Sequence, residues 1–337
     1  MDLKDFNTEM QPAIDQELRR VVEDFATQNF SDLTAILAYQ LGWGGEGAGL
    51  EAQGKRLRPL LVTLAAKACG GEWEKALPAA AAVELLHNFS LIHDDIEDGS
   101  DLRRGRPTVW VKWGQALAIN AGDAMYALAF EAVKRLEQTV NGLAALRAYG
   151  VMTTTSLKLT GGQHLDISFE DALSLPMESY WLMLKGKTAS LLQACLQLGA
   201  VSALADPDVI SDLGNFGLHL GLAFQIQDDW LGIWGDENVT GKSKASDLIT
   251  GKKTLPILYG LQQGNEFSDA WAKRSENSSH TNRLAELLVV NGAEAYTLSQ
   301  AQHSMDAAMD SLEKCAIDSE LKSVFRQLAG SLVNRRH

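Results

Sequence analysis

Long segments without helix-breaking residues constrain this chain most. Only seven prolines occur in 337 residues, and proline is the residue that a helix interior tolerates least. Apolar residues recur at the i, i+3, i+4 spacing that places them on one face of an α-helix. The pattern predicts long helices over residues 77–98, 115–138, 143–169, 177–203 and 208–234, and two or three more over residues 293–336. Because strand-like alternation is rare, the sequence predicts an all-α fold.

The composition is that of an acidic globular protein. Apolar residues make up 46% of the chain, and no linker rich in proline and serine interrupts it. We therefore expect a single domain over residues 1–337. The formal net charge of −13 argues against nucleic acid as the main partner. A local basic patch can still bind an anion on an acidic protein.

The cysteines and the apolar runs bear on cellular location. The three cysteines are scattered without a C-x-x-C spacing, which fits reduced thiols rather than disulfides or a zinc site. No uninterrupted apolar run is long enough to cross a bilayer, and residues 1–16 do not resemble a signal peptide. These features predict a cytoplasmic protein without a membrane span.

Three segments interrupt the helical pattern. Residues 42–54 are rich in glycine and predict a flexible loop, and residues 99–108 are polar and basic. Residues 235–254 are rich in Gly, Lys, Asp and Ser, and are a candidate lid over a site. Ordinary solvated loops have the same composition, so the argument depends on the residues within them.

Carboxylates gather at the end of the first predicted long helix. Asp94 and Asp98 are four residues apart and share a helical face, with Asp95 about 100° round the helix. The C-terminus of a helix favours cations, so an acidic end indicates a bound cation. Mg²⁺ prefers oxygen ligands and completes its shell with water and phosphate. The alternative is an acidic helix end that faces water.

A second polar stripe lies on the helix predicted for residues 208–234. Gln225, Asp228 and Asp229 follow the i, i+3, i+4 spacing on an otherwise apolar helix. Buried polar groups need partners, so the stripe indicates a wet, metal-lined cavity. Either acidic pair is a weak signal alone, and two of them on apolar helices are more specific.

Basic clusters lie near the acidic segments. Residues 54–59 read G-K-R-L-R-P, residues 103–108 read R-R-G-R-P-T, residues 185–188 read K-G-K-T, and further lysines stand at 242, 252 and 253. A basic run is commonly a solvated face. A diphosphate, however, needs both Mg²⁺ to bridge its oxygens and Arg or Lys to neutralise the remaining charge.

A series of motifs makes the sequence resemble the trans-isoprenyl diphosphate synthases, the polyprenyl synthetase family, and within it the medium-chain geranylgeranyl and farnesyl diphosphate synthases. The motifs are G-K-R-x-R-P from residue 54, H-x-x-S-L-I-H-D-D-x-x-D from 87, R-R-G-x-P-T from 103, G-Q-x-x-D from 162, K-T-A from 187, F-Q-I-x-D-D from 224, G-K from 241 and D-L-x-x-G-K-x-T-L-P from 247. Each is weak alone, and their order is specific. The resemblance implies the isoprenoid synthase fold, an orthogonal helical bundle around a central cavity.

The resemblance also implies a role for each matched residue. Ligands of Mg²⁺, about three ions per active site with Mn²⁺ as a substitute, would be Asp94, Asp95, Asp98, Asp228 and Asp229. Contacts to the allylic diphosphate would come from Arg103, Lys187, Lys242 and Lys252. Isopentenyl diphosphate would be held by Lys55, Arg58, His87 and Arg104, with Arg335 or Arg336 as a further candidate. Thr188 and Gln225 would steady the developing cation.

The implied reaction is a head-to-tail, trans condensation in three steps. The allylic diphosphate ionises, the double bond of isopentenyl diphosphate attacks C1 of the allylic cation, and the released diphosphate accepts the final proton. Excluded water protects the cation, which is the role expected for the lid at residues 235–254.

One position departs from the family pattern. The second acidic motif usually ends in a third aspartate, and this chain has Gly232 there. Asp236 is the next acid, but eight residues beyond Asp228 is about 12 Å along a helix, too far for simple replacement. We therefore expect the metal to rely on Asp228 and water.

The chain length of the prenyl product should depend on residues that precede the first acidic segment on the same helix. Phe89 lies five residues before Asp94, roughly 7.5 Å deeper by helical rise, and Ser90 beside it is small. An aromatic residue at this position resembles the floor of medium-chain synthases. We expect geranylgeranyl diphosphate (C20) as product and farnesyl diphosphate (C15) second. The alternative is a floor at Met125 or Tyr126, with Phe89 in the core.

Other functions remain as alternatives. A class I terpene cyclase would use the acidic helices but would not need Lys55, Arg58 and His87 for a second diphosphate. An HD-type phosphohydrolase would need further His or Asp ligands, and His164 is isolated. A non-catalytic synthase subunit would tend to lack the acidic motifs. The family resemblance further implies a homodimer.

Overall fold

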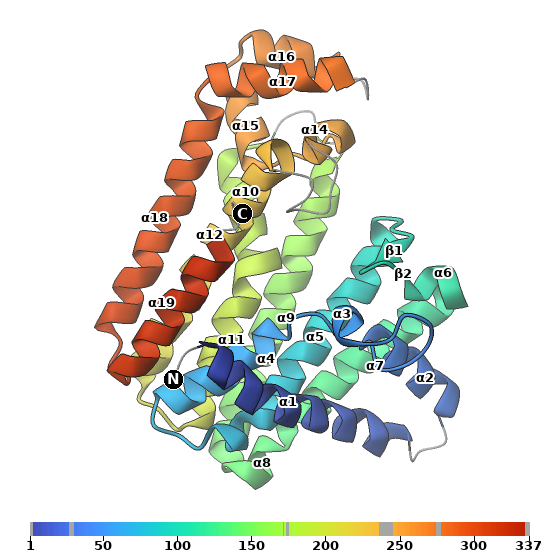
Figure 1. Cartoon of the computed structure of the whole chain (residues 1–337), viewed down its shortest axis with the longest axis vertical. Coiled ribbons are helices and arrows are strands. Elements are labelled where there is room, and N and C mark those ends of the chain that lie inside the picture. Colours follow the sequence, from blue (N-terminus) through green and yellow to red (C-terminus); the bar gives the residue numbers. More distant parts are fainter. Residues whose placement is uncertain are drawn as a thin grey trace. The chain divides into compact units, whose positions relative to one another are not determined.

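The computed structural model describes residues 3–26, 30–170, 172, 175–235, 245–273 and 278–333. Within these residues the regular elements are α-helices, apart from a 3-10 turn, a π-helical turn and a single two-stranded hairpin (Figure 1). The predicted all-α fold is therefore confirmed. None of these helices is both long and apolar enough to cross a membrane.

The first elements extend to residue 139. They are α1 (Leu3–Ala26), α2 (Ser31–Gln40), α3 (Leu50–Gln53), α4 (Leu57–Ala68), the 3-10 turn η1 (Trp73–Ala76), α5 (Leu77–Glu97), β1 (Leu102–Arg103), β2 (Arg106–Pro107), α6 (Val109–Trp113), α7 (Gln115–Lys134) and α8 (Leu136–Thr139).

The later elements begin at residue 142. They are α9 (Gly142–Glu170), α10 (Met177–Leu184), the π-helical turn η2 (Lys185–Ala189), α11 (Ser190–Ser202), α12 (Pro207–Trp234), α14 (Ser246–Thr250), α15 (Leu255–Gln262), α16 (Glu266–Trp271), α17 (Ser278–Val290), α18 (Ala293–Lys314) and α19 (Ser319–Val333).

The predicted long helices are present, with two internal breaks. The helix expected over residues 115–138 is divided at Arg135 into α7 and α8, and the one over 177–203 contains η2. The helices predicted for the C-terminal region are α18 and α19. Helix α1 was not predicted, although its buried positions follow a helical stripe that includes Phe6, Met10 and Ile14.

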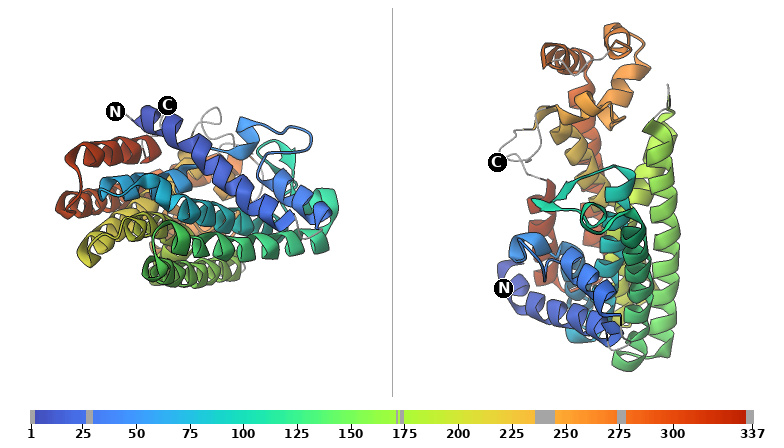
Figure 2. Two further views of the ribbon diagram at one scale, coloured as in Figure 1. Left: turned by 90° about the horizontal axis from the view of Figure 1, so that it is seen from below. Right: turned by 90° about the vertical axis from the view of Figure 1, so that its right-hand side faces the viewer.

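The chain divides into two compact units, each assembled from separate segments. Unit 1 comprises Met1–Ser156, Ala194–Gly214 and Cys315–Lys322, and unit 2 comprises Leu157–Gln193, Asn215–Lys314 and Ser323–His337. Helices α9, α11, α12 and α19 contribute residues to both units (Figures 1 and 2). The expectation of a single domain stays a prediction.

Helix α5 is the central helix of unit 1. Pro78 stands in its first turn, where the missing N–H costs nothing, and a buried run of alanines at residues 79–82 follows. Small side chains allow α4 and α7 to pack closely against α5. The carboxyl end of the helix is less buried, and Asp94 there is partly exposed. The same helix thus forms the core and carries the first acidic segment to the surface.

The hairpin after α5 has the turn that its sequence allows. Arg103 pairs with Arg106 across the two strands, so Arg104 and Gly105 form a two-residue loop. Both have positive φ, 52° and 73°, which is the geometry of a type I′ turn. This turn directs the basic residues of the R-R-G-R-P-T motif to different neighbours.

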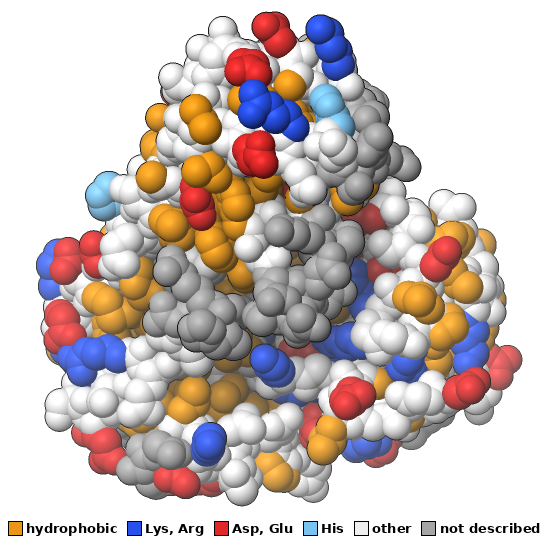
Figure 3. All heavy atoms as spheres, turned by 45° about the horizontal axis from the view of Figure 1, so that its top comes forward, with side chains coloured by type: hydrophobic (Ala, Val, Ile, Leu, Met, Phe, Trp, Pro, Cys, Tyr) orange, Lys and Arg blue, Asp and Glu red, His pale blue; other side chains and the backbone are white. Residues whose placement is uncertain are grey.

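In unit 2 the middle of α12 packs closely on the π-helical turn η2 and the start of α11. A Cβ at Gly221 would lie 2.7 Å from Ala189 Cα, so only glycine permits this approach. The core there includes Tyr180, Leu184 and Ile226. A second apolar cluster joins the carboxyl end of α12 to α14, α15, α16 and α17. A few charged side chains lie among uncharged ones on the outer side of α16 and α17, at the top of Figure 3.

The candidate lid at residues 235–254 is only partly described. Residues 236–244 lie outside the described residues. The remainder is not a simple loop, because it contains α14 and places Leu248 and Thr254 in the interior with 2% of each residue exposed. The composition of the segment concealed this short helix, since its apolar residues are too few to show a period.

Candidate active site

The first acidic segment presents two kinds of carboxylate. Asp94 is partly exposed and Asp98, the residue that caps α5, is exposed. Asp95 is only 1% exposed. These positions lie at the carboxyl end of the helix, where the backbone dipole favours cations.

Asp95 is held by the hairpin that follows α5. Arg103 Nε lies 2.9 Å from both carboxylate oxygens of Asp95, and Arg103 Nη2 lies 2.7 Å from Oδ1. Burial raises the pKa of Asp95 above its ordinary value, and the Arg103 guanidinium counteracts part of that shift. The ion pair therefore positions both the hairpin and the end of α5. Metal binding by Asp95 and diphosphate binding by Arg103 stay predictions.

Two further arginines of the hairpin hold the glycine-rich segment. Arg106 donates to the carbonyl oxygens of Tyr39, Gly44 and Glu46 at 2.8–3.1 Å. Arg104 Nη1 donates to Ala52 O at 2.7 Å. The segment predicted as a flexible loop is thus tied down by arginine–carbonyl bonds, which the spacing of glycines in the sequence does not reveal.

Arg58 and His87 form the centre of the predicted isopentenyl diphosphate site. Arg58 Nη1 lies 3.2 Å from His87 Nε2. Burial, followed by the charges of Arg58 and Arg104, lowers the pKa of His87 well below its ordinary value. The ring is therefore neutral at pH 7, and Nε2 accepts from Arg58 because a guanidinium can only donate. The ring proton then resides on Nδ1, while Lys55 lies exposed nearby in sequence.

A buried ion pair between Arg56 and Glu84 lies next to Arg58 and His87 in the sequence. Arg56 Nη1 donates to Glu84 Oε1 at 2.6 Å, and Arg56 Nη2 donates to Leu41 O at 2.9 Å. Asn88 Nδ2 also donates to Glu84 Oε1, at 2.9 Å. The two charged side chains are 1% and 4% exposed. Arg56 is therefore a structural residue between Lys55 and Arg58, the two residues of the G-K-R-x-R-P motif that are predicted to bind diphosphate.

The second acidic segment belongs to unit 2. Asp229 is buried, and its Oδ2 accepts from Tyr180 Oη at 2.6 Å and from Leu255 N at 3.0 Å. Gln225 Nε2 donates to the other oxygen at 3.2 Å, and Gln225 Oε1 accepts from Thr188 at 3.0 Å. This network orients Thr188 and Gln225 together. Asp228 is partly exposed beside it.

Tyr180 is the donor that keeps this network in place. Burial, with the negative charge of Asp229, raises the pKa of Tyr180 well above its ordinary value. The phenol therefore remains protonated and donates to the carboxylate. Sequence reasoning missed Tyr180 because one tyrosine in an apolar helix has no distinguishing pattern.

Lys187 lies in the π-helical turn η2. Its Nζ forms an ion pair with Asp166 Oδ2. A Cβ at Gly162 would lie 2.2 Å from Lys187 N, so the glycine allows α9 to approach η2 and brings Asp166, one turn later, to the lysine. Single π-helical turns are frequent at functional sites. The G-Q-x-x-D motif was the signal that could have pointed to Asp166.

The predicted lysines of the candidate lid are not equivalent. Lys242 lies outside the described residues, as do Arg335 and Arg336. Lys252 is exposed just after α14. Lys253 Nζ instead donates to Phe169 O and Glu170 O at the carboxyl end of α9, where a cation satisfies carbonyls that the helix leaves open.

The donor set fits Mg²⁺ shared with a substrate. Among the described residues, no three His, Cys, Asp or Glu side chains converge into a ready-made metal centre. Mg²⁺ is commonly held by one or two carboxylates together with substrate phosphates and water. Carboxylates of that kind are Asp94 on α5, Asp98 at its C-cap and, in unit 2, Asp228 on α12.

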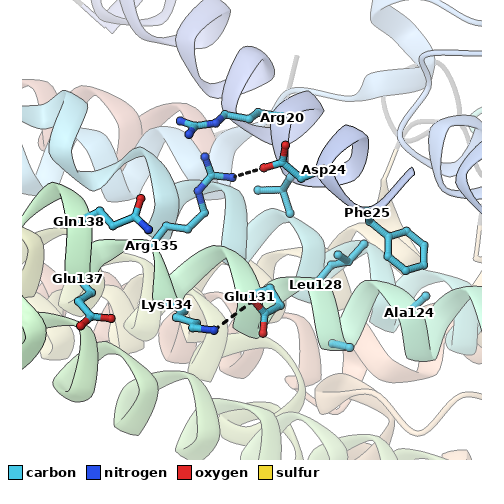
Figure 4. A pocket seen from close by; sticks show the side chains of 12 residues that line it. Arg20, Asp24, Phe25, Ala124, Leu128, Glu131, Lys134, Arg135, Glu137 and Gln138 are labelled. Carbon is cyan, nitrogen blue, oxygen red and sulfur yellow. Dashed lines mark hydrogen bonds and ion pairs between the residues drawn. The ribbon is translucent and has the colours of Figure 1, made fainter. Parts of the chain in front are cut away.

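A separate pocket of about 620 Å³ lies in unit 1 between α1 and the α7–α8 segment (Figure 4). Both signs of charge line it, including an ion pair between Arg135 and Asp24 at 3.3 Å. None of the residues predicted to bind diphosphate or metal lines this pocket. It is therefore distinct from the candidate active site.

The aromatic residue predicted to limit chain length belongs to a row of rings. The centroid of Phe89 lies 4.8 Å from that of His93 and 5.0 Å from that of Tyr126. Tyr126 in turn lies 5.1 Å from Phe130. Phe89 is partly buried, so it is neither a fully enclosed core residue nor a free surface ring. Ser90 donates to His87 O at 2.8 Å.

Comparison with known proteins identifies the family. A sequence model described as Polyprenyl synthetase matches residues 48–288. The geranylgeranyl diphosphate synthase of Saccharolobus solfataricus is 38% identical over 85% of this chain and 87% of its own length. The (2E,6E)-farnesyl diphosphate synthase of Mycobacterium bovis is 37% identical over 89% of this chain and 86% of its own length.

A solved structure shows that the fold is also shared. The geranylgeranyl pyrophosphate synthase of Corynebacterium glutamicum, complexed with isoprenyl diphosphate and magnesium, has a TM-score of 0.83 and 28% identity, and the match covers 100% of both chains. These findings define an all-α synthase. The chain belongs to the polyprenyl synthetase family.

Proposed function

We propose that this chain is a Mg²⁺-dependent trans-prenyltransferase that condenses isopentenyl diphosphate with an allylic diphosphate. The observation that carries the proposal is a feature shared by the two acidic segments. In each pair the second aspartate, Asp95 or Asp229, is buried and held by hydrogen bonds. The first, Asp94 or Asp228, is partly exposed. Each helix would thus present one partly exposed carboxylate to a cation, next to a buried carboxylate that hydrogen bonds hold in place.

One group of residues acts on the departing diphosphate, and another binds the isopentenyl substrate. Mg²⁺, when bound, supplies the charge that neutralises the departing diphosphate. Lys187 in unit 2 and Arg103 in unit 1 are each a cationic side chain suited to diphosphate oxygens. Both are held in place, by Asp166 and Asp95 respectively, so they need little reorganisation during reaction.

Arg58, His87, Lys55 and Arg104 bind the diphosphate of the isopentenyl substrate. Because His87 is neutral, it contributes an N–H donor, and the arginines and the lysine provide the charge. The Thr188–Gln225 pair turns oxygen dipoles toward the allylic cation as it forms. After the new bond forms, the released diphosphate accepts the proton, so no protein base is needed.

A direct assay tests this function. Purified protein is incubated with Mg²⁺, radiolabelled isopentenyl diphosphate and dimethylallyl, geranyl or farnesyl diphosphate, and the products are identified. We expect chain extension that EDTA abolishes and that Mg²⁺ or Mn²⁺ restores, with about three ions per active site in a metal titration. Cyclic hydrocarbons would instead indicate a terpene cyclase, and absence of any product would contradict the proposal.

The product that we propose is geranylgeranyl diphosphate, with farnesyl diphosphate second. Phe89 and Tyr126 form the floor that ends elongation, because their rings contact each other across α5 and α7. Replacing Phe89 with alanine removes one of the two rings of this floor. We expect Phe89→Ala to shift the products by one or more C5 units, measured by chromatography of the dephosphorylated alcohols.

A matched variant tests whether the loss of any ring from the row Phe89–Tyr126–Phe130 changes the product length. Phe130→Ala removes the ring that packs on the far side of Tyr126 from Phe89. We expect the product length of this variant to stay close to that of the wild type. If Phe89→Ala gave the same product length as the wild type, Phe89 would have no role in chain termination.

The assembly that we propose is a homodimer in the cytoplasm. Within unit 1, α7 and α9 expose large apolar side chains, among them Ile119 at 42%, Leu143 at 59% and Leu146 at 70%. Exposed apolar side chains of this size are suited to a protein interface where they form a continuous patch. Free thiols at the three cysteines fit a reducing compartment. Sedimentation equilibrium should give twice the chain mass, and a monomer at micromolar concentration would exclude the dimer.

A further inference from the structure

Gly54 is the first residue of the G-K-R-x-R-P motif, and the predicted diphosphate contacts give it no role. It is the C-cap of the short helix α3, with φ 73° and ψ −174°. This backbone conformation is almost confined to glycine. The conformation explains why glycine is tolerated there, but not what the missing side chain makes room for.

The guanidinium of Arg104 fills the space that a side chain at residue 54 would need. A Cβ built on Gly54 would lie 2.6 Å from Arg104 Nη2, 2.7 Å from Cζ and 2.9 Å from Nη1. These distances are well below van der Waals contact, so the guanidinium lies directly on the backbone of Gly54. Arg104 Nη1 also donates to Ala52 O at 2.7 Å. We call the backbone of residues 52–54 the Arg104 seat.

The hairpin that carries Arg104 is held by other contacts. Arg103 forms the ion pair with Asp95, and Arg106 donates to Glu46 O in the glycine-rich segment. Arg104 itself stands in the two-residue loop between β1 and β2. The contact with the seat therefore fixes the direction of the Arg104 side chain, while its neighbours fix the position of the hairpin.

The seat places Arg104 among the other basic residues of unit 1. Burial against its neighbours lowers the pKa of Arg104, the Glu84 carboxylate counteracts this, and nearby arginines, among them Arg58 and Arg103, lower the pKa further. The charge of Arg104 in turn helps to lower the pKa of His87. Such a convergence of like charges is suited to an anion, which removes the repulsion between them.

Arg104 keeps donors for a ligand while it lies on the seat. A guanidinium has five N–H donors in a planar fork, and Ala52 O accepts from one of its nitrogens. Within the part of the chain that the structure describes, this side chain forms no other hydrogen bond or ion pair. Part of Arg104 also remains exposed to solvent.

We propose that Gly54 is a positioning residue for the isopentenyl diphosphate site, because its missing side chain lets the Arg104 guanidinium lie on the seat and present its remaining donors to the diphosphate. This inference rests on the proposed function, since the diphosphate is that of the isopentenyl substrate. A side chain at residue 54 would lift Arg104 from the seat and leave Arg103 on Asp95. Binding of the isopentenyl substrate would then weaken without an equal loss at the allylic site.

Four variants test this role. They are Gly54→Ala, Arg104→Ala, the double variant Gly54→Ala/Arg104→Ala, and the control Gly49→Ala. Gly49 flanks α3 on the other side with φ 148° and ψ −172°, and a Cβ there would meet nothing within 4 Å. The control therefore adds backbone strain of the same kind without displacing Arg104. Steady-state kinetics give kcat and both KM values, and isothermal titration calorimetry gives the Kd of isopentenyl diphosphate.

We expect Gly54→Ala to raise the KM and the Kd of isopentenyl diphosphate by about 10- to 100-fold, the effect of losing one hydrogen bond between charged groups. The allylic KM and kcat should change little, because a contact that is equally strong before and during the reaction affects only the KM of its own substrate. Arg104→Ala should show the same pattern, and Gly49→Ala should resemble the wild type.

The double variant distinguishes a seat for Arg104 from general strain. We expect its Kd to equal that of Arg104→Ala, because the new methyl group then meets no guanidinium. Additive losses would overturn the inference, since residue 54 would then act without Arg104. The wild-type Kd in Gly54→Ala would overturn it as well.

Arg104→Lys covers the case in which Gly54→Ala does not fold. It leaves the backbone of residue 54 unchanged and keeps the charge, but an ammonium has no planar fork to lie on the seat. We expect its Kd to rise, and the wild-type Kd would count against the seat. An unchanged protein that binds isopentenyl diphosphate but forms no prenyl product would contradict the proposed function instead, while the Kd values would still test the seat.

Discussion

Replacing Asp94 or Asp228 with alanine is expected to reduce turnover by about 100-fold or more, the scale of a lost electrostatic stabiliser of a transition state. Each variant removes the partly exposed carboxylate of its acidic segment and leaves the buried partner in place. The loss should appear mainly in kcat, because the charge on the leaving diphosphate develops as the C–O bond breaks. Steady-state kinetics at saturating Mg²⁺ measure the effect.

The control for these variants is another acidic residue of α12. Asp208 is exposed in the first turn of that helix, and Asp208→Ala should turn over substrate at the wild-type rate. Folding is checked by the far-UV circular dichroism of each protein. Wild-type turnover in both Asp94→Ala and Asp228→Ala would rule out the assignment of the two carboxylates to the metal.

Replacing Arg56 with methionine is expected to lower the free energy of unfolding by about 3–5 kcal/mol, the cost of breaking a buried ion pair on one side. Glu84 would keep a buried carboxylate without its guanidinium partner, and Leu41 O would lose a donor. Equilibrium denaturation in urea measures the change.

A double variant separates the charge from the packing. In Arg56→Met/Glu84→Gln the buried charge at residue 84 is gone, although Asp15 still loses its ion pair with Arg56. The amide oxygen can still accept from Asn88, so we expect the double variant to be more stable than Arg56→Met. Arg283→Ala removes an exposed ion pair with Glu266 and should change stability little. Equal stability of Arg56→Met and the wild type would show that this pair contributes nothing to folding.

Most of the helical framework could be predicted from local sequence. The period of apolar residues in 77–98, 143–169 and 208–234 marks α5, α9 and α12 to within a residue or two, because a helix depends on neighbours only three and four residues away. Short elements such as α14 escaped, since one turn is too brief to show a period. The π-helical turn η2 was not predicted, because residues 185–188 stood out only as a basic cluster within the helix predicted for residues 177–203.

The sequence predicted a candidate site as a set of residues, but it did not predict which partners each of these residues has. The sequence analysis assigned both aspartates of each pair to metal, namely Asp94, Asp95, Asp228 and Asp229. In the structure, Asp95 accepts from Arg103 and Asp229 accepts from Tyr180. Nothing in an Asp–Asp pair tells which carboxylate turns inward. Likewise, the basic cluster at residues 54–59 includes Arg56, which is buried against Glu84.

The sequence by itself determined the all-α class, the long helices, the family and the kinds of side chain available for a diphosphate and a metal. These depend on residue type and on spacing along one chain, which are properties of the sequence. Only the tertiary structure decided which charges are buried as supports and that the Arg104 guanidinium fills the space beside Gly54. Those facts depend on which segments pack together, and segments many residues apart meet only once the helices are folded against one another.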